Sequence, residues 1–340
     1  MSRSYVSWAV RVMSCSKSIA LAFGLALLLA IGAPGAAQSA SLRVGYSDWP
    51  GWVAWQVAVD KGWLKQAGID VEFEWLDYSV SLDAFAAGNL DGVLATNGDT
   101  LRMGNQGKGV MIMVTDYSNG NDMIVARSDI KSITDLKGQK IGLEIGLVDH
   151  LLLLNALRQA HMTAKDVTIV SSKTSDTPKM LSSGQVAAIA AWEPIAGQAI
   201  RSVPGSHAVY TSASAPGLIY DVLTVSTDSL REHRADWVKL IKVWDRVVHY
   251  IDDAATHDDA VKIMSARVGV APEIYNAFLK GTRFIGLSDG KRVMVDGPSV
   301  ASLYGSTRNV DAFNVVYGIY RMSRPVASFI DPSLTAAALK

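Results

Sequence analysis

Short apolar runs alternate with stretches of helical periodicity along most of the chain. Runs that are wholly apolar, or that alternate apolar with charged residues, are typical of strands. The helical stretches between them often end at a glycine. In the first part of the chain we predict strands at 42–46, 69–75, 90–95 and 110–115 and helices at 52–66, 81–87 and from 97 onward. This alternation predicts an α/β fold with largely parallel sheets.

The same order of elements recurs further along the chain. We predict strands at 140–143, 167–171 and 186–191, helices at 146–160 and 178–183, and helices in the tail at 237–250, 260–267 and 272–280. Extended runs at 122–127 and 220–226 flank the second set of strands. The pattern therefore predicts two lobes joined by two crossing strands, which is typical of hinge closure around a ligand. Lobe one would comprise 41–127 plus 222–340, and lobe two 128–221.

Residues 1–40 have the layout of a secretory signal peptide. Arg3, Arg11 and Lys17 precede an apolar run at 19–33, and small residues follow at 35–40. That order is typical of a cleaved signal, and the run is shorter than the roughly 20 residues of a spanning helix. The alternative is an uncleaved membrane anchor. Either Met1 or Met13 could be the start, since Lys17 alone would supply a basic region, and the exact cleavage site stays open.

Composition excludes cysteine chemistry in the exported chain and argues against strongly charged partners. Cys15, the only cysteine, precedes the apolar run, so the exported chain would have no disulfide, thiolate metal ligand or thiol nucleophile. The chain has 32 basic and 32 acidic residues, and removal of the leader leaves a net charge of about −3. So weak a balance argues against nucleic acid or an anionic membrane as the partner.

Several ordered motifs resemble one known family. They lie at 43–46 (RVGY), 61–71 (KGWLKQAGIDV), 87–92 (AGNLDG), 133–142 (ITDLKGQKIG), 184–188 (GQVAA) and 191–194 (AWEP). Together they resemble the periplasmic binding proteins of nitrate, sulfonate and taurine importers, which share a fold with thiamine-pyrimidine precursor (NMT1/THI5-like) binders. The resemblance implies a type II periplasmic-binding-protein fold with two Rossmann-like lobes. It also implies a monomeric periplasmic receptor that serves an ABC permease and its ATPase, with a small solute as cargo and no nucleic acid or cofactor.

Ligands of open α/β sheets bind beyond the carboxyl ends of the strands, which nominates particular loops here. The residues that we predict to contact the ligand follow predicted strands or open the second crossing: Asp48, Trp49, Tyr78, Asn97, Asp99, Asp116, Tyr117, Asp149, Trp192, Glu193, Tyr220 and Asp221. Asp99 and Asp149 stand at helix starts, where anion binders of the resembled family usually carry hydroxyl groups. His150 is the only basic side chain in these loops.

Carboxylates interleaved with aromatic rings favour a cation or a neutral amide over an anion. We therefore expect a nitrogen compound such as guanidinium, urea or an amine. Taurine, an alkanesulfonate, nitrate or a thiamine-pyrimidine precursor is the alternative. Asp99 and Asp149 could instead be helix caps, and Asp48 and Asp116 exposed loop ends. Trp52, Trp55 and Trp63 share helical spacing, so at least two should lie in the core.

The sequence does not favour an enzyme. Dinucleotide, Walker, nucleophile-elbow and zinc-protease motifs do not occur, and the six histidines show no ligand-like pairing, so we expect no bound metal. Catalysis by two carboxylates, a thiamine-pyrimidine synthase on the same fold and a sensor protein remain open as rivals.

Overall fold

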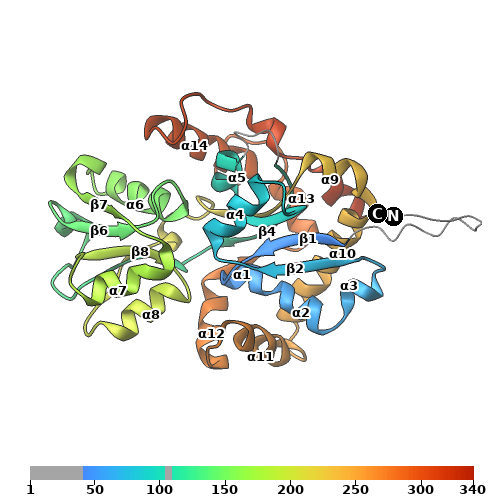
Figure 1. The fold of residues 1–340 in the computed structure, drawn as a ribbon, viewed down its shortest axis with the longest axis horizontal. Helices are drawn as coiled ribbons and strands as arrows, with labels where there is room; N and C mark the ends of the chain where they lie inside the picture. Colours follow the sequence, from blue (N-terminus) through green and yellow to red (C-terminus); the bar gives the residue numbers. More distant parts are fainter. Residues whose placement is uncertain (1–40, 104–108) are drawn as a thin grey trace, which may run out of the picture. The chain divides into compact units, whose positions relative to one another are not determined.

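The computed structural model describes residues 41–103 and 109–340. The predicted signal peptide, with its alternative start and its cleavage site, lies outside these residues. Within the described part, no helix combines the length and the apolar character that crossing a membrane requires. Strands of the described part form two separate sheets (Figure 1).

The first sheet has six strands in the order β11-β4-β10-β3-β1-β2. They are β1 (Leu42–Tyr46), β2 (Val71–Trp75), β3 (Gly92–Thr96), β4 (Val110–Ser118), β10 (Tyr220–Val225) and β11 (Thr282–Phe284). β1 pairs in parallel with β2 and β3, whereas β10 runs antiparallel between β3 and β4. β3 and β10 are wholly buried because they lie inside the sheet, and β2 at the edge is only partly covered.

The second sheet has five strands in the order β7-β6-β8-β5-β9. They are β5 (Asp122–Ala126), β6 (Lys140–Leu143), β7 (Thr168–Ser171), β8 (Ala188–Trp192) and β9 (His207–Thr211). β6, β7 and β8 are parallel, and β5 runs antiparallel to β8 and β9. Both sheets are therefore mixed rather than largely parallel, since strands that arrive from the other sheet run against their neighbours.

The crossings between the sheets are short. β4 ends at Ser118 and β5 begins at Asp122, so the first crossing takes residues 119–121, where Gly120 has a φ of 135°. The second crossing takes residues 212–219. The sequence predicts that residues 122–127 belong to lobe one, whereas β5 pairs with β8 and β9 of the second sheet. The lobe boundaries themselves stay a prediction.

Helices cover both faces of each sheet. In the second sheet α6 lies on one face and α7 and α8 on the other, and in the first sheet α4 and α5 lie opposite α1 and α2 (Figure 1). The helices are α1 (Pro50–Val53), α2 (Trp55–Asp60), α3 (Trp63–Gln66), α4 (Tyr78–Ala86), α5 (Asn97–Met103), α6 (Val148–Gln159), α7 (Thr177–Ser182), α8 (Ile195–Ser202), α9 (Thr227–Glu232), α10 (Arg234–Asp252), α11 (His257–Val268), α12 (Pro272–Lys280), α13 (Leu287–Val293), α14 (Leu303–Val316) and α15 (Ser333–Ala338). Short 3-10 turns occur at Ile133–Leu136, Ala164–Asp166, Thr174–Asp176, Ser212–Ser214 and Val326–Phe329.

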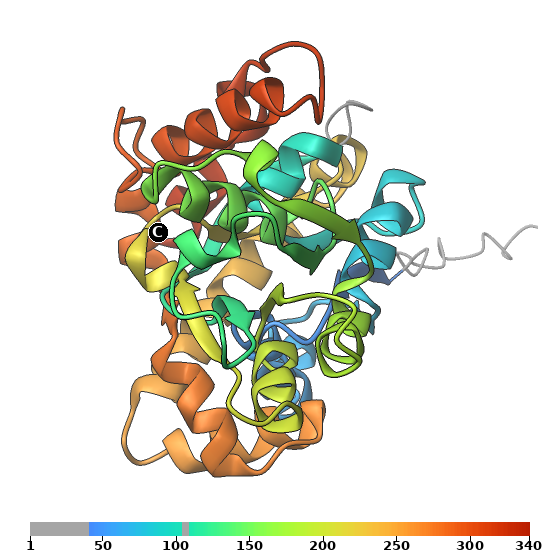
Figure 2. The same cartoon turned by 90° about the vertical axis from the view of Figure 1, so that its left-hand side faces the viewer.

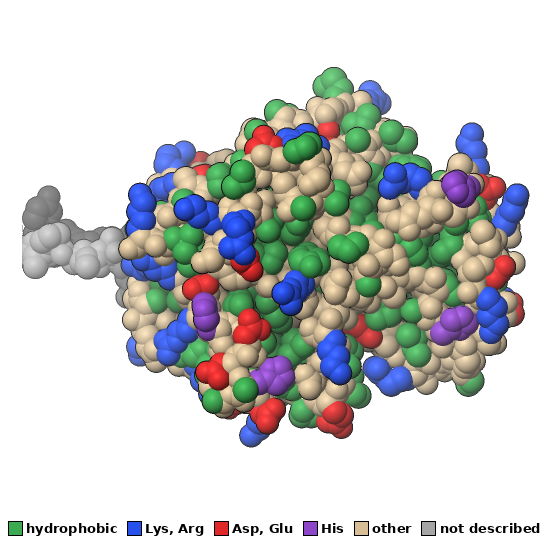
Figure 3. Space-filling view, turned by 180° about the vertical axis from the view of Figure 1, so that it is seen from behind, with side chains coloured by type: hydrophobic (Ala, Val, Ile, Leu, Met, Phe, Trp, Pro, Cys, Tyr) green, Lys and Arg blue, Asp and Glu red, His purple; other side chains and the backbone are tan. Residues whose placement is uncertain are grey.

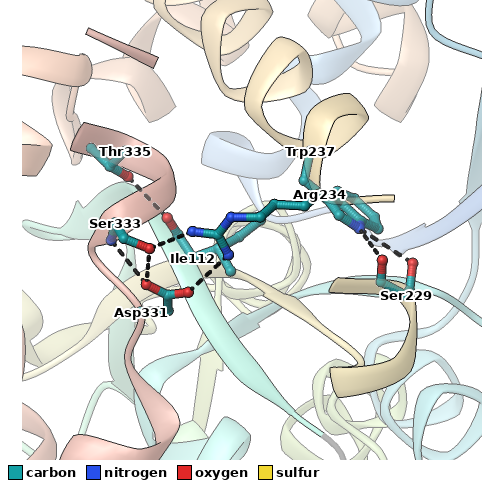
Figure 4. Close-up of polar contacts among 7 residues, drawn as sticks. All are labelled: Ile112, Ser229, Arg234, Trp237, Asp331, Ser333 and Thr335. Atoms are coloured by element: carbon teal, nitrogen blue, oxygen red, sulfur yellow. Dashed lines mark hydrogen bonds and ion pairs between the residues drawn. The ribbon is translucent and has the colours of Figure 1, made fainter. Parts of the chain in front are cut away.

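The helical tail packs onto the first sheet. Trp244 of α10 is fully buried and packs against Trp55, with ring centroids 5.0 Å apart. Arg234 bonds to Asp331 and Ser333, and the Thr335 hydroxyl donates to the backbone carbonyl of Ile112 in β4 (Figure 4). Figure 2 shows α14 and the α11–α12 pair at opposite ends of this view. The tail therefore stabilises the sheet that carries half of the candidate site.

Surface charge gives no single-sign patch on the face seen in Figure 3, where basic and acidic side chains are interspersed. This agrees with the equal numbers of basic and acidic residues in the whole chain. Several acidic side chains are instead buried inside the molecule, among them Asp116, Asp122, Asp149 and Asp221.

Candidate functional site

A small closed cavity lies where strand ends of both sheets meet. Its volume is about 10 Å³, which is room for about one water molecule. The residues that line it come from the ends of β1, β3, β5, β8 and β10 and from the starts of α1, α4 and α6: Trp49, Trp52, Tyr78, Thr96, Asp122, Val148, Trp192, Ile219 and Asp221. Four of them are aromatic, two are acidic and none is basic. The walls are aromatic and acidic, but the volume admits about one water, so any larger ligand would require the two sheets to move apart.

Three aromatic rings at the cavity each donate a hydrogen bond to an aspartate. The Trp49 indole N–H donates to Asp116 at 2.8 Å, and the Tyr78 hydroxyl donates to Asp99 at 2.7 Å. The Trp192 indole N–H donates to Asp48 at 3.1 Å. Trp192 ends β8 of the second sheet and Asp48 follows β1 of the first, so this bond joins the two lobes. These carboxylates orient the rings and add negative charge behind them.

Asp99 and Asp149 do not act as helix caps. α5 begins at Asn97 and α6 at Val148, so each aspartate lies inside the first turn. Asp99 accepts hydrogen bonds from Tyr78 and from the Thr96 hydroxyl, at 2.7 and 2.9 Å. Asp149 accepts one from the Thr174 hydroxyl at 3.1 Å. The alternative of exposed loop ends also fails for Asp116, which is fully buried.

Two aspartates face the cavity with an oxygen that has no partner. Asp122 opens β5 and Asp221 lies in β10, and each is only 2% exposed. The Oδ2 atoms of both are buried without a hydrogen bond among the described residues. Asp122 therefore reaches the cavity from the second sheet and Asp221 from the first. The sequence pattern does not point to Asp122, because residues 122–127 show only the extended run of a crossing strand.

Burial is the main cause of the raised pKa values of the aspartates around the cavity. It raises the pKa of Asp48, Asp99 and Asp116 to about 6 and that of Asp122 to about 7. The pKa of Asp149 is also raised, by burial and then by the nearby charge of Asp122. Removing a carboxylate from water disfavours its charged form unless a positive charge or a donor replaces the solvent. Asp122, with a pKa of about 7, is therefore about half protonated at neutral pH.

An outer pocket of about 90 Å³ adjoins the inner cavity and shares Tyr78 and Trp192 with it. These two rings pack edge to face, with centroids 5.6 Å apart. The outer pocket also carries Asp48, Glu144 and an ion pair between Lys173 and Asp77 at 3.9 Å. The outer pocket therefore has side chains of both charges, whereas the charged side chains of the inner cavity are all acidic. The Tyr78–Trp192 contact lies between the two.

Four predicted ligand residues have other places. The Asn97 amide donates to Ser306 and Thr307 of α14 at 3.1 Å, which ties α5 to the tail. Tyr117 and Tyr220 pack against each other, with centroids 5.9 Å apart. Glu193 turns back to accept from the Gly197 N–H at 2.9 Å. None of these side chains lines the inner cavity.

The structure also places the three helically spaced tryptophans and His150. Trp55 and Trp63 lie in the core, as their spacing predicts, whereas Trp52 is buried but lines the cavity. His150 packs against Phe313 and Tyr317 of the tail, and burial lowers its pKa. Across residues 41–103 and 109–340, no three His, Cys, Asp or Glu side chains are grouped to hold a metal ion.

Comparison with protein families gives one clear assignment. The model described as "NMT1/THI5 like" matches residues 49–254, which is more than half of the chain. This protein belongs to that family.

The curated relatives are similar over only part of their length. A protein of Brucella abortus (strain 2308) named as a binding protein is 31% identical over 172 residues, which cover 50% of this chain and 53% of the relative. A protein of Escherichia coli (strain K12) named as an aliphatic sulfonates-binding protein is 26% identical over 162 residues, covering 45% and 50%. The chain thus spans about half the length of the curated relatives it matches.

Solved structures show the fold. The alkanesulfonate-binding protein SsuA of Xanthomonas axonopodis pv. citri, bound to MOPS, has a TM-score of 0.73 at 16% identity and covers 87% of this chain and 100% of its own. The desulfurization enzyme DSZB has a TM-score of 0.64 at 18% identity, covering 88% and 98%. The two-lobed periplasmic-binding-protein fold and the family resemblance are confirmed. Since this fold carries both a binder and an enzyme, the fold alone does not decide the function.

Proposed function

We propose that this protein is the periplasmic solute-binding component of an ABC importer. It would close around a compact nitrogen cation, with guanidinium favoured, and hand it to a membrane permease driven by an ATPase. The family, the two-lobed fold, relatives named as binding proteins and the secretory pattern of residues 1–40 support this role. Lobe one (41–127 plus 222–340) and lobe two (128–221) would move about the two crossings.

One observation carries the choice of cargo. Asp122 and Asp221 each hold a buried, unpartnered oxygen at a cavity walled by aromatic rings, and no basic side chain lines that cavity. A planar cation could stack on a ring and donate through its edge to both carboxylates. Because the two aspartates belong to different sheets, such a ligand would hold the lobes together. Asp48, Asp99 and Asp116 would act indirectly, by orienting the rings.

A sulfonate-type anion is the second candidate, because relatives named as sulfonate binders exist and one solved neighbour holds MOPS. Buried carboxylates around the cavity oppose it, since like charges in a low-dielectric site repel strongly. Binding rather than catalysis is our proposal for the site. The unpartnered oxygens of Asp122 and Asp221 give it acceptors for the N–H groups of a cation.

Titration calorimetry at pH 7.5 with guanidinium, urea, taurine, nitrate and methanesulfonate tests this proposal. We expect one guanidinium per protein and no heat of binding from the zwitterion taurine or from the anions nitrate and methanesulfonate. A thermal-shift series gives an independent check, since a ligand at a hundred times its dissociation constant stabilises a protein by about 2.7 kcal/mol. Binding of an anion without binding of guanidinium would overturn the proposal.

A further inference from the structure

Two of the buried aspartates form a cross-strand pair. Asp116 of β4 and Asp221 of β10 are directly opposite each other in the sheet, with exposures of 0% and 2%. Opposite side chains on neighbouring strands have Cβ atoms about 5 Å apart. Burial and the charge of Asp116 raise the pKa of Asp221, as expected for two carboxyl groups that face each other across a buried strand pair. Two carboxylates cannot hydrogen bond to each other unless one of them carries a proton.

No positively charged side chain lines the cavity beside this pair. Asp122 of β5 and Asp99 of α5 add negative charge near Asp221, and Tyr275 of α12 faces Asp116 with its hydroxyl donated to the Pro50 carbonyl at 2.9 Å. The Trp49 indole N–H donates to Asp116 at 2.8 Å, and the Thr115 hydroxyl also lowers the pKa of Asp116. A doubly ionised pair would therefore have only neutral donors against several neighbouring carboxyl groups.

Gly51 fixes how closely this pair is enclosed. A Cβ atom at Gly51 would lie 2.2 Å from Oδ2 of Asp116, so the backbone of α1 closes directly over that oxygen. Water has no room on this side of the pair. Solvent therefore cannot reach the Asp116 carboxyl group from the α1 side.

We infer that Asp116 and Asp221 hold one proton between them in the ligand-free protein, and that a bound cation displaces it. The second half of this inference rests on the proposed function, and the first half does not. The proton belongs to the pair rather than to one member, since strongly coupled sites titrate together. Cation uptake would thus be coupled to proton release.

The first half is tested on ligand-free protein by chemical denaturation between pH 5 and pH 8. The folded state should bind more protons than the unfolded state in this range, so the wild-type denaturation midpoint should fall as pH rises. Asp116→Asn and Asp221→Asn each leave a pair with a single titrating group, so both should reduce this fall by a similar amount. Asp83→Asn, at an exposed position of α4, is the matched control and should leave the wild-type slope unchanged. A slope that neither variant alters, or that only one alters, would overturn the shared proton.

The second half is tested by calorimetry of guanidinium binding in two buffers of different ionisation enthalpy at pH 6.5. We expect the apparent enthalpy to differ between buffers in the sense of proton release, and the difference to shrink in Asp116→Asn. If guanidinium binds with no buffer dependence, the displacement is wrong although the proposed function stands. If guanidinium does not bind, the proposed function fails, and the denaturation result still decides the first half.

Discussion

Aspartates at two places in this protein, the tail and the inner cavity, have opposite surroundings. In the tail, Asp331 accepts bonds from Arg234, at 3.4 Å, and from the backbone and side chain of Ser333 (Figure 4). Despite its partial burial, these donors and the Arg234 charge lower its pKa. At the cavity, Asp122 and Asp221 have an oxygen without a partner, and burial raises the pKa of Asp122 to about 7.

Under the function that we propose, the difference separates a structural carboxylate from a ligand-binding one. A buried polar group without a partner lowers the stability of the fold, whereas a paired one is close to neutral or stabilising. A fold that keeps two such aspartates at one small cavity loses stability that a cation can restore. Four experiments test whether the paired and the unpartnered aspartates differ in this way.

The largest effect should come from Asp122→Asn. Hydrogen bonds to charged groups contribute about 1.5–3 kcal/mol, so losing the carboxylate should weaken guanidinium binding by roughly 10- to 150-fold. The measurement is titration calorimetry at pH 7.5. Asp331→Asn, at the paired aspartate, is the matched control and should bind guanidinium as the wild type does. Equal losses in the two variants would contradict the contrast.

The pH dependence of binding should be the next largest effect. A carboxyl group with a pKa of about 7 is about one-tenth ionised at pH 6 and about nine-tenths ionised at pH 8. Since the cation needs the ionised form, guanidinium affinity should rise about tenfold from pH 6 to pH 8. Calorimetry at both values checks this, and an affinity that falls with pH would show that the raised pKa of Asp122 plays no part.

A smaller effect should follow from Trp192→Phe. This change keeps a ring at the cavity but removes the indole N–H that bonds to Asp48. A neutral donor to a charged acceptor and the stronger cation–π face of tryptophan together should account for a loss of about three- to tenfold in affinity. Trp63→Phe, in the core beside Tyr250, is the matched control for an unrelated tryptophan. A larger loss in the control would indicate a folding effect.

The smallest effect concerns the tail. Arg234→Gln removes an ion pair to Asp331 whose side chains are about half and one-quarter exposed, so it should lower the free energy of unfolding by at most about 1 kcal/mol. Urea denaturation measures this loss, and guanidinium affinity should stay unchanged. A change in affinity would show that the tail and the cavity are coupled.

Much of the fold was predictable from local patterns. The strands at 42–46 and 140–143 and the helix at 272–280 have the predicted bounds. The helix predicted at 52–66 is instead three short helices, because Gly62 adopts a φ of 67° between the second and the third. The edge strands β9 and β11 were not predicted, since tertiary pairing rather than local sequence defines them.

The site was less predictable than the fold. Strand-end loops led to Trp49, Tyr78, Trp192 and Asp221, all of which line the inner cavity, and their role in ligand binding stays a prediction. Sequence could not separate them from Asn97, whose partners lie more than 200 residues away in α14. It also missed Asp122, because the absence of a partner for a buried oxygen is a property of the folded molecule alone.

A crystal structure of the protein with guanidinium tests the central claim most directly. We predict that the cation lies against a ring of the inner cavity, with its nitrogen atoms within about 3 Å of both Asp122 and Asp221. A structure in which that cavity holds an anion, or in which guanidinium binds without contacting either aspartate, would contradict the account.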